Sequence, residues 1–321
     1  MKTVSIFVFK LNLTSMKLSS ILFITFVTLL AKNYVHASSQ PLNPQRIVVA
    51  GGSITEVIYA LGEQQRIVGV DSTSVYPAAA TQKPQIGYVR KISVEGVLSL
   101  NPDLILAESD IGPKKMVEQL KLTGANLVIL HENDNFWRIE NKIEQIAKQL
   151  NVVSKGDMLA QSLQADRKAL SYILEQTSTK PKVLVIRSSQ LMVAGAETTA
   201  DELVTIAGGV NMMAQTVVNW QTISSEAALA LNPDVIISMG IGANDQQPSA
   251  EILSVFKYSN AIKNGRIYNF DALYLLSMGP RTPQAAVELA HAFYPKTRLP
   301  DGYQYRFLKL AENSTKQQDE R

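Results

Sequence analysis

Cysteine is absent from all 321 residues of this sequence. Without a thiol, the chain has no disulfide, no thiolate metal site and no cysteine nucleophile. It also lacks the N-terminal cysteine on which an exported protein is tethered by lipid. Oxygen and nitrogen donors therefore remain as the candidates for holding a metal ion.

A large charge of one sign is also missing. The 31 Lys and Arg residues nearly balance the 28 Asp and Glu residues, which leaves a formal net charge of +3. No basic run reaches four residues, whereas a nucleic-acid-binding surface needs clustered basic side chains. We therefore expect no nucleic acid among the partners. The 46% share of hydrophobic residues is typical of a folded globular protein.

No apolar run is long enough to cross a bilayer as a helix, which takes about 20 residues. The run over residues 18–31 instead has the length of the core of a secretory signal, and lysines but no acidic residues precede it. Small residues at Val35 and Ala37 predict cleavage after Ala37. The alternatives are an uncleaved anchor and a translation start at Met16 instead of Met1.

Removal of this segment changes the charge of the protein. The segment carries four lysines and no acid, so the mature chain has a formal charge of +3 − 4 = −1. Since no second long apolar run follows, we expect a soluble, exported protein. A periplasm is the simplest compartment for it.

A repeat divides the remaining chain. Residues 92–106 recur as residues 223–237, an offset of 131 positions, with more than half of the positions identical. In each copy Ser93 or Ser225 can begin a helix with a glutamate in its first turn, and Asn-Pro-Asp ends that helix. The apolar run that follows is typical of a buried strand in a parallel sheet. Each copy therefore predicts helix, turn and strand.

A second pair of segments supports the duplication. Residues 46–62 predict a strand, a Gly-Gly turn and a helix that begins with the capping box Ser53-Ile54-Thr55-Glu56. In the other half, a strand at residues 183–186 precedes the similar box Thr199-Ala200-Asp201-Glu202. Each half thus indicates an α/β lobe with a mainly parallel sheet.

One long helix connects the two halves. Leucines at spacings of 4, 7 and 4 predict a helix between the halves, and a single helix limits hinge motion. The predicted parts are a signal peptide (1–37), an N-terminal lobe (38–154), the linking helix (155–178), a C-terminal lobe (179–298) and a polar tail (299–321). Two similar Rossmann-like lobes place a ligand cleft between the carboxyl ends of their strands. Export, this architecture and the missing catalytic constellation favour a binding protein over an enzyme.

The repeated motif S-x-E-x-(V/A)-L-x-L-N-P-D-(L/V)-I and the opening Val49-Ala50-Gly51-Gly52-Ser53-Ile54-Thr55-Glu56 resemble substrate-binding proteins of ABC importers for iron complexes and cobalamin. The resemblance covers roughly residues 46–295. The Tyr-x-Arg of residues 87–96 and the Gly-Pro-Arg of residues 273–284 resemble the haem-binding subgroup. The resemblance implies a periplasmic haem (hemin) receptor that catalyses no reaction. It would deliver haem b, as Fe(III), to an inner-membrane ABC permease with its ATPase, and act as a monomer.

The same resemblance implies Tyr88 as the axial ligand of the haem iron. A phenolate oxygen is a donor that suits ferric iron. Arg90 shares a face with Tyr88 in an extended segment, so it can stabilise the phenolate or pair with a haem propionate. Arg281 is the corresponding propionate partner from the second lobe. The alternative is that all three are ordinary solvated residues.

Five further residues are candidates. Met192, Tyr274 and Met278 would form an apolar wall for a porphyrin, with core packing as the alternative. Glu95 and Glu226 match the two glutamates that, in the family, dock on arginines of the permease. Complementary surface charge would fix the register of that contact. Both glutamates also stabilise the N-terminus of a helix, and the two roles are compatible.

Two other functions compete with the haem receptor. The first is a ferric-siderophore or cobalamin receptor of the same fold, which needs no iron-ligating tyrosine. The second is an exported α/β hydrolase, because Gly51-Gly52-Ser53 follows a strand and opens a helix. That segment lacks the G-x-S-x-G and Walker patterns, and Ser53 is interpreted as a helix cap.

Overall fold

The computed structural model describes residues 43–130, 136–187, 190–240, 248–307 and 312–313. The predicted signal peptide and its cleavage site lie outside these ranges. The described residues from Asn43 onward belong to one compact unit. None of the helices in the described ranges combines the length and the apolar character that a membrane crossing requires.

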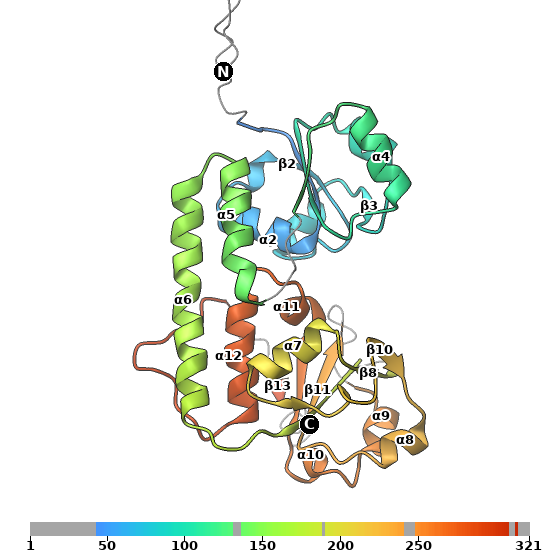
Figure 1. Cartoon of the computed structure of the whole chain (residues 1–321), viewed down its shortest axis with the longest axis vertical. Coiled ribbons are helices and arrows are strands. Elements are labelled where there is room, and N and C mark those ends of the chain that lie inside the picture. Colours follow the sequence, from blue (N-terminus) through green and yellow to red (C-terminus); the bar gives the residue numbers. More distant parts are fainter. Residues whose placement is uncertain (1–42, 131–135, 188–189, 241–247, 308–311, 314–321) are drawn as a thin grey trace, which may run out of the picture. The chain divides into compact units, whose positions relative to one another are not determined.

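The N-terminal lobe is a parallel sheet of four strands in the order β2-β1-β5-β6 (Figure 1). Its strands are β1 (Ile47–Ala50), β2 (Ile67–Val70), β5 (Leu104–Glu108) and β6 (Leu127–Leu130). Its helices are α2 (Gly52–Ala60), α3 (Val94–Ser99), α4 (Lys114–Leu122) and α5 (Ile139–Gln149). Alternate residues of β1 enter separate hydrophobic clusters, with Ile47 and Val49 in one and Val48 and Ala50 in the other. Both faces of this sheet are therefore covered, which explains the unbroken apolar strands.

The C-terminal lobe contains a mixed sheet in the order β10-β8-β7-β11-β12-β13, with β9 paired to β7. Its strands are β7 (Lys182–Arg187), β8 (Gln190–Ala194), β9 (Val210–Asn211), β10 (Trp220–Thr222), β11 (Val235–Gly240), β12 (Ile267–Asp271) and β13 (Glu312–Asn313). Its helices are α7 (Thr199–Ile206), α8 (Ser225–Leu229), α9 (Ala250–Val255), α10 (Asn260–Lys263), α11 (Ala272–Leu276) and α12 (Thr282–Phe293). Strands β7, β11 and β12 are parallel, whereas β8, β10 and β13 pair antiparallel. The two-lobed α/β fold is confirmed, although only the central strands of this lobe repeat the first one.

Helix α6 (Val153–Glu175) links the lobes and lies beside α5 and then α12 (Figure 1). Its 23 residues make it about 34 Å long. The predicted leucine stripe faces the core, with Leu163 and Leu170 buried and Leu159 and Leu174 partly buried. A Cβ on Gly156 would lie 2.4 Å from the Cβ of Ala147, so the glycine permits the close crossing of α5 and α6.

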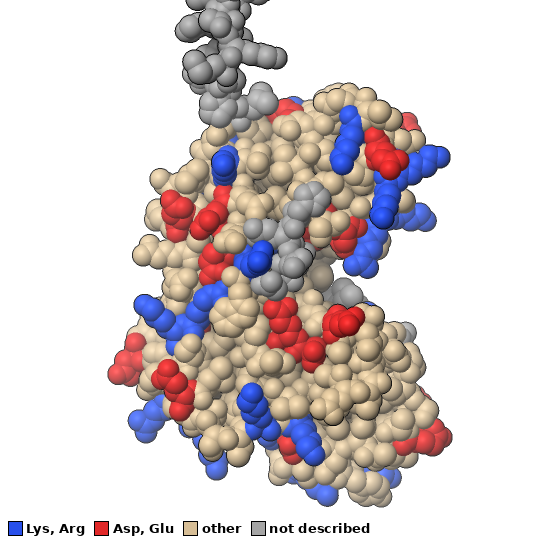
Figure 2. Space-filling model, in the orientation of Figure 1, with Lys and Arg blue, Asp and Glu red and all other residues tan. Residues whose placement is uncertain are grey.

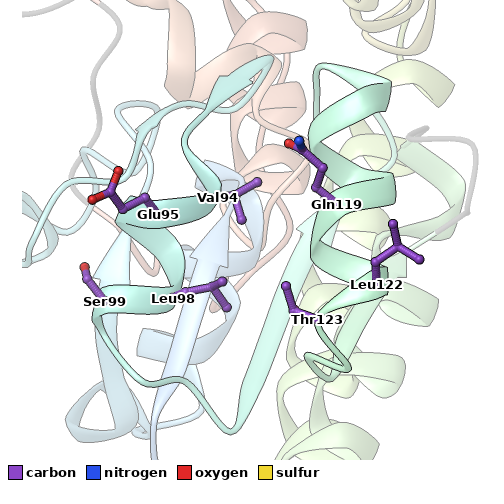
Figure 3. A pocket seen from close by; sticks show the side chains of 7 residues that line it. All are labelled: Val94, Glu95, Leu98, Ser99, Gln119, Leu122 and Thr123. Carbon is purple, nitrogen blue, oxygen red and sulfur yellow. The ribbon is translucent and has the colours of Figure 1, made fainter.

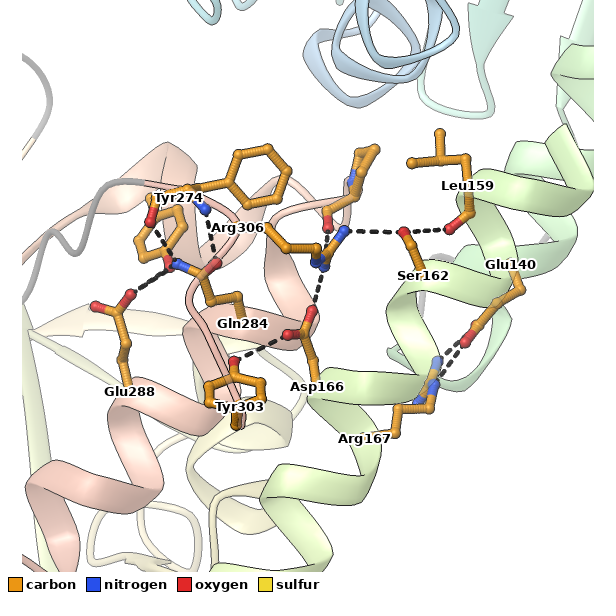
Figure 4. A network of polar contacts seen from close by, with 12 residues as sticks. Glu140, Leu159, Ser162, Asp166, Arg167, Tyr274, Gln284, Glu288, Tyr303 and Arg306 are labelled. Atoms are coloured by element: carbon orange, nitrogen blue, oxygen red, sulfur yellow. Dashed lines mark hydrogen bonds and ion pairs between the residues drawn. The ribbon is translucent and has the colours of Figure 1, made fainter. Parts of the chain in front are cut away.

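A strap of residues 299–307, defined here as the segment that follows α12, packs on the long helix (Figure 4). The Tyr303 hydroxyl donates to Asp166 Oδ1 at 2.9 Å, and Arg306 forms an ion pair with the same buried carboxylate. The backbone N–H of Phe307 donates to Gln284 Oε1 at 2.9 Å. Residues of the predicted polar tail thus fasten α6 to α12.

Helix caps follow the sequence only in part. Ser93 accepts a hydrogen bond from the backbone N–H of Gly96 and caps α3, as predicted. Ser224, not Ser225, caps α8, and Thr198 precedes the predicted box to cap α7. The serine caps of α3 and α8 occupy equivalent positions of the repeat.

Asp234 directly precedes strand β11, and its carboxylate accepts two hydrogen bonds. The donors are the backbone N–H of Lys182 at 3.0 Å and the side-chain amide of Asn260 at 3.1 Å. Partial burial acts to raise the pKa of this carboxyl, but the hydrogen bonds and Arg266 outweigh burial and hold its pKa below the ordinary value. The carboxylate, in its ionised form, therefore ties the start of β7 to the first residue of α10.

Candidate functional site

A pocket of about 240 Å³ lies between the two lobes. Its charged lining comes from the N-terminal lobe and consists of Glu56, Arg90, Glu108 and Asp110, and polar residues of both lobes, among them Ser53, Tyr88, Thr199 and Ser277, join them. Its apolar lining comes largely from the C-terminal lobe and includes Leu273, Leu276 and Met278. Figure 2 shows the molecule hollowed between the lobes on one side. The pocket lies at the carboxyl ends of β1 and β5, where open α/β sheets bind ligands.

Tyr88 reaches this pocket from a short hairpin, β3 (Gly87–Tyr88) and β4 (Lys91–Ile92). Gly87 has a φ of 106°, and a Cβ there would lie 2.9 Å from the carbonyl oxygen of Lys91. A glycine is therefore needed for the chain to turn into the hairpin. Tyr88 itself is 45% exposed, so its ring is accessible from solvent as well as from the pocket.

Arg90 lies on the same hairpin and pairs with Asp110. The Arg90 Nε atom lies 2.9 Å from Asp110 Oδ2, and both side chains are largely exposed. The hydrogen bond and charge of Asp110 raise the pKa of the Arg90 guanidinium, and the neighbouring Tyr88 adds a smaller effect. The structure thus brings Tyr88 and Arg90 together, and it adds Asp110, which the sequence did not single out.

Ser53 and Glu108 form a polar floor for the pocket, and Ser53 also binds the buried Lys142. The Ser53 hydroxyl donates to Glu108 Oε1 at 2.5 Å and accepts from the Nζ of the buried Lys142 at 3.0 Å. Gly51 has a φ of 144°, and a Cβ there would come within 2.6 Å of Glu108. The glycine makes room for the carboxylate. The position of Glu108 at the end of a buried strand was the one sequence signal for this group.

Glu56 and Arg281 form a buried ion pair between the lobes. Arg281 donates through Nε at 2.8 Å and through Nη2 at 2.6 Å to the two carboxylate oxygens of Glu56. The guanidinium carbon also lies 3.6 Å from the centre of the Tyr76 ring. Burial raises the pKa of the Glu56 carboxyl, and Arg281 opposes part of that rise. The bidentate geometry joins α2 to the start of α12.

The predicted capping box at Ser53–Glu56 is wrong. The N-cap of helix α2 is Gly51, two residues before the predicted Ser53, and no side chain caps the helix. Ser53 instead binds Glu108, and Glu56 instead binds Arg281, which lies 225 residues further along the chain. Both side chains that the local pattern assigned to the helix end therefore bind residues that are distant in the sequence.

The three candidates for an apolar wall lie in different places. Met278 is buried, has a φ of 52° and lines the cleft. Tyr274 is fully buried, and its hydroxyl donates to Glu288 Oε1 at 2.8 Å. Burial and the charge of Glu288 raise the pKa of Tyr274. Met192 lies in β8 opposite Thr222 and is half-buried. Among the described residues, the cleft lining includes Met278 but neither Tyr274 nor Met192.

Glu95 and Glu226 occupy the first turns of α3 and α8, and both are exposed. Hydrogen bonds from its own backbone N–H and from the Ser224 hydroxyl lower the pKa of Glu226. These two carboxylates lie outside the cleft lining in the described residues. They are therefore available to solvent on each lobe.

Two α/β lobes, one linking helix and an interlobe pocket define a substrate-binding protein of the kind that serves ABC transporters. Residues 47–274 match the model of the periplasmic binding protein family, and the chain belongs to that family. This confirms the resemblance read from the repeat. The family consists of transport proteins and not of enzymes, which confirms the prediction of a binding protein.

Three relatives show how the similarity is distributed. The structure of the periplasmic heme-binding protein RhuT from Roseiflexus sp. RS-1 has 34% identity and a TM-score of 0.71, covering 78% of this chain and 98% of RhuT. The substrate-binding lipoprotein YvrC of Bacillus subtilis is 30% identical over 264 residues, which are 79% of this chain and 81% of YvrC. The vitamin B12-binding protein of Photorhabdus laumondii is 27% identical over 204 residues, which are 61% of this chain and 71% of that protein.

Proposed function

We propose that this protein, after export and cleavage following Ala37, is a monomeric periplasmic haem receptor. It binds ferric haem b at the interlobe cleft and delivers it to an ABC permease. The observation that carries the proposal is the exposed phenol of Tyr88 at a pocket lined by both lobes. A phenolate is an established haem ligand. The Arg90 guanidinium lies on the same hairpin and lines the same pocket.

The size of the pocket sets how a macrocycle would lie. The volume of about 240 Å³ is below the roughly 300–1,000 Å³ of typical small-molecule pockets. We therefore place haem across the mouth, with iron over Tyr88 and the porphyrin against Leu273, Leu276 and Met278 of the facing lobe. Met192 stays a candidate for a contact further along that wall, whereas Tyr274 is fully buried and packs in the core.

The propionates need cationic partners. Arg90 is exposed and within reach of solvent, so it can share its guanidinium between Asp110 and a propionate. Arg281 is the second proposed partner, and its buried guanidinium already binds both oxygens of Glu56. A propionate on Arg281 would have to replace that carboxylate, so Arg90 is the more accessible of the two.

The test is a hemin titration of the purified protein, followed in the Soret region. We expect the wild type to shift the Soret band and the Tyr88→Phe variant to lose that shift, because phenylalanine has no oxygen to bind iron. Tyr258→Phe is the matched control, since Tyr258 is 71% exposed but does not line the cleft. An unchanged hemin spectrum with the wild-type protein would sink the proposal, as would an equal shift in the Tyr88 variant.

A cobalamin receptor is the second candidate, favoured by the similarity to a vitamin B12-binding protein. A corrinoid brings its own cobalt ligands, so it would not depend on a phenolate. Calorimetric titration with cyanocobalamin tests this candidate directly. Binding that is tight and insensitive to Tyr88→Phe would favour it over haem, and a ferric siderophore can be titrated in the same way.

We further propose that Glu95 and Glu226 dock the loaded receptor on the permease, one glutamate from each lobe. Both carboxylates are exposed at the same position of the repeat. A permease that presents one basic residue to each glutamate would bind the receptor in one orientation, or in the orientation in which the two lobes are exchanged.

A further inference from the structure

A surface groove of about 640 Å³ lies between helices α3 and α4 of the N-terminal lobe (Figure 3). Val94 and Leu98 extend from α3 toward α4, and Leu122 lies at the end of α4. Leu122 is 87% exposed, which is unusual for a large apolar side chain beside other apolar ones. Glu95 is the one charged residue among those that line this groove, and it extends from the other side of α3.

The C-terminal lobe repeats part of this arrangement. Leu98 follows Glu95 by three positions, and Leu229 follows Glu226 by three positions. Residues three apart on a helix are neighbours on its surface. Leu229 is 54% exposed, and α8 packs beside α9 as α3 packs beside α4. Each lobe therefore displays a carboxylate with an exposed or partly exposed leucine next to it.

We infer that Leu122, beside Leu98 in the α3–α4 groove, and Leu229 of the C-terminal lobe are the apolar anchors of the permease contact, and that the α3–α4 groove is the larger of the two contact sites. This inference rests on the proposed docking role of Glu95 and Glu226. The occupant is a surface segment of the permease in which a bulky apolar side chain stands next to an arginine or lysine. The single negative charge beside an apolar groove matches a segment of that composition.

The two kinds of contact have different tasks. An exposed ion pair in water adds little net affinity, but it guides approach and fixes the register. Leu122 gains most from the contact, because nearly all of its side chain is in water before docking. Loss of the carboxylate therefore slows association, whereas loss of the leucine speeds dissociation.

The experiment measures association and dissociation rates of hemin-loaded protein on the permease–ATPase complex of the same organism, held in lipid nanodiscs. The variants are Leu122→Ser, Leu229→Ser and the pair Glu95→Ala with Glu226→Ala. Met158→Ser is the matched control, because Met158 is 72% exposed on α6, away from the groove. A hemin titration of every variant runs in parallel.

We expect Leu122→Ser to dissociate about tenfold faster or more, as for removal of one buried leucine, with hemin affinity unchanged. Leu229→Ser has a smaller effect in the same direction, and Met158→Ser behaves as the wild type. If dissociation is unchanged in both leucine variants while the glutamate variant docks more slowly, the leucines are not anchors of the contact. The proposed receptor function would not be affected by that result. A wild type that binds hemin but not the nanodisc overturns both docking claims. Sedimentation that shows a wild-type dimer lost in Leu122→Ser would assign the groove to a second copy of the chain.

Discussion

The ion pair between Glu56 and Arg281 supports a quantitative prediction about how the lobes are held. Its side chains are only 5% and 4% exposed, and two hydrogen bonds of 2.8 and 2.6 Å join them. Replacing Arg281 by Met leaves the Glu56 carboxylate buried without its partner. Replacing Glu56 by Met likewise leaves the Arg281 guanidinium buried without its partner.

The size of the effect follows from the burial. Breaking a buried ion pair from one side costs about 3–5 kcal/mol, because one charge stays uncompensated. At roughly 2 °C per kcal/mol for a chain of this size, each single variant should lose about 6–10 °C in Tm. The double variant with Met at both positions removes both charges, so its Tm should lie within a few degrees of the wild type.

Thermal unfolding followed by circular dichroism at neutral pH measures these differences. Arg90→Met is the control, because it breaks an exposed ion pair whose loss costs no more than about 1 kcal/mol. The reasoning is refuted if the single Glu56 and Arg281 variants lose no more than the control. It is also refuted if the double variant falls as far as the sum of the two single variants.

Two further predictions concern the cleft floor and acid stability. Gly51→Ala should lower the free energy of unfolding in urea by about 1–3 kcal/mol, because its φ is 144° and the new Cβ meets Glu108 at 2.6 Å. Gly62→Ala is the control for the backbone effect alone, since Gly62 has a φ of 76° and open space around it. Equal losses in the two variants would argue against the contact with Glu108. Asp234 has a lowered pKa, so it stabilises the fold above about pH 4 and this contribution is lost as the pH falls through the folded value. Asp234→Asn should lower the free energy of unfolding at pH 7 and reduce its further fall as the pH becomes acidic. A loss of the same size at every pH would contradict the assignment.

The repeat predicted most of the fold because it encodes local structure twice. An apolar run after Asn-Pro-Asp forms β5 in one lobe and β11 in the other, and a leucine stripe forms α6. The antiparallel strands β8, β10 and β13 were not predicted. Strands β10 and β13 are short, lie at the edges of the sheet and pair with segments distant in sequence, whereas β8 follows β7 directly in the chain and pairs with it.

The candidate site was predictable only where its chemistry lies within one segment. Tyr88 and Arg90 were identified by the resemblance of the contiguous Tyr-x-Arg motif to the haem-binding subgroup, and both line the cleft. Ser53 was assigned to a helix cap because that pattern is local. Its actual partners, Glu108 and Lys142, lie 55 and 89 residues away, and no periodicity reports such contacts.

The strap over α6 bears on how receptors of this architecture could exchange ligand specificity. Asp166 lies on the long helix and is wholly buried, yet its partners Tyr303 and Arg306 come from beyond the C-terminal lobe. A chimera that took this lobe from one receptor and α6 from another would leave a buried carboxylate facing foreign side chains. The smallest exchangeable block is therefore the lobe together with the long helix and the strap, and the cleft-facing loops are the natural place for finer changes.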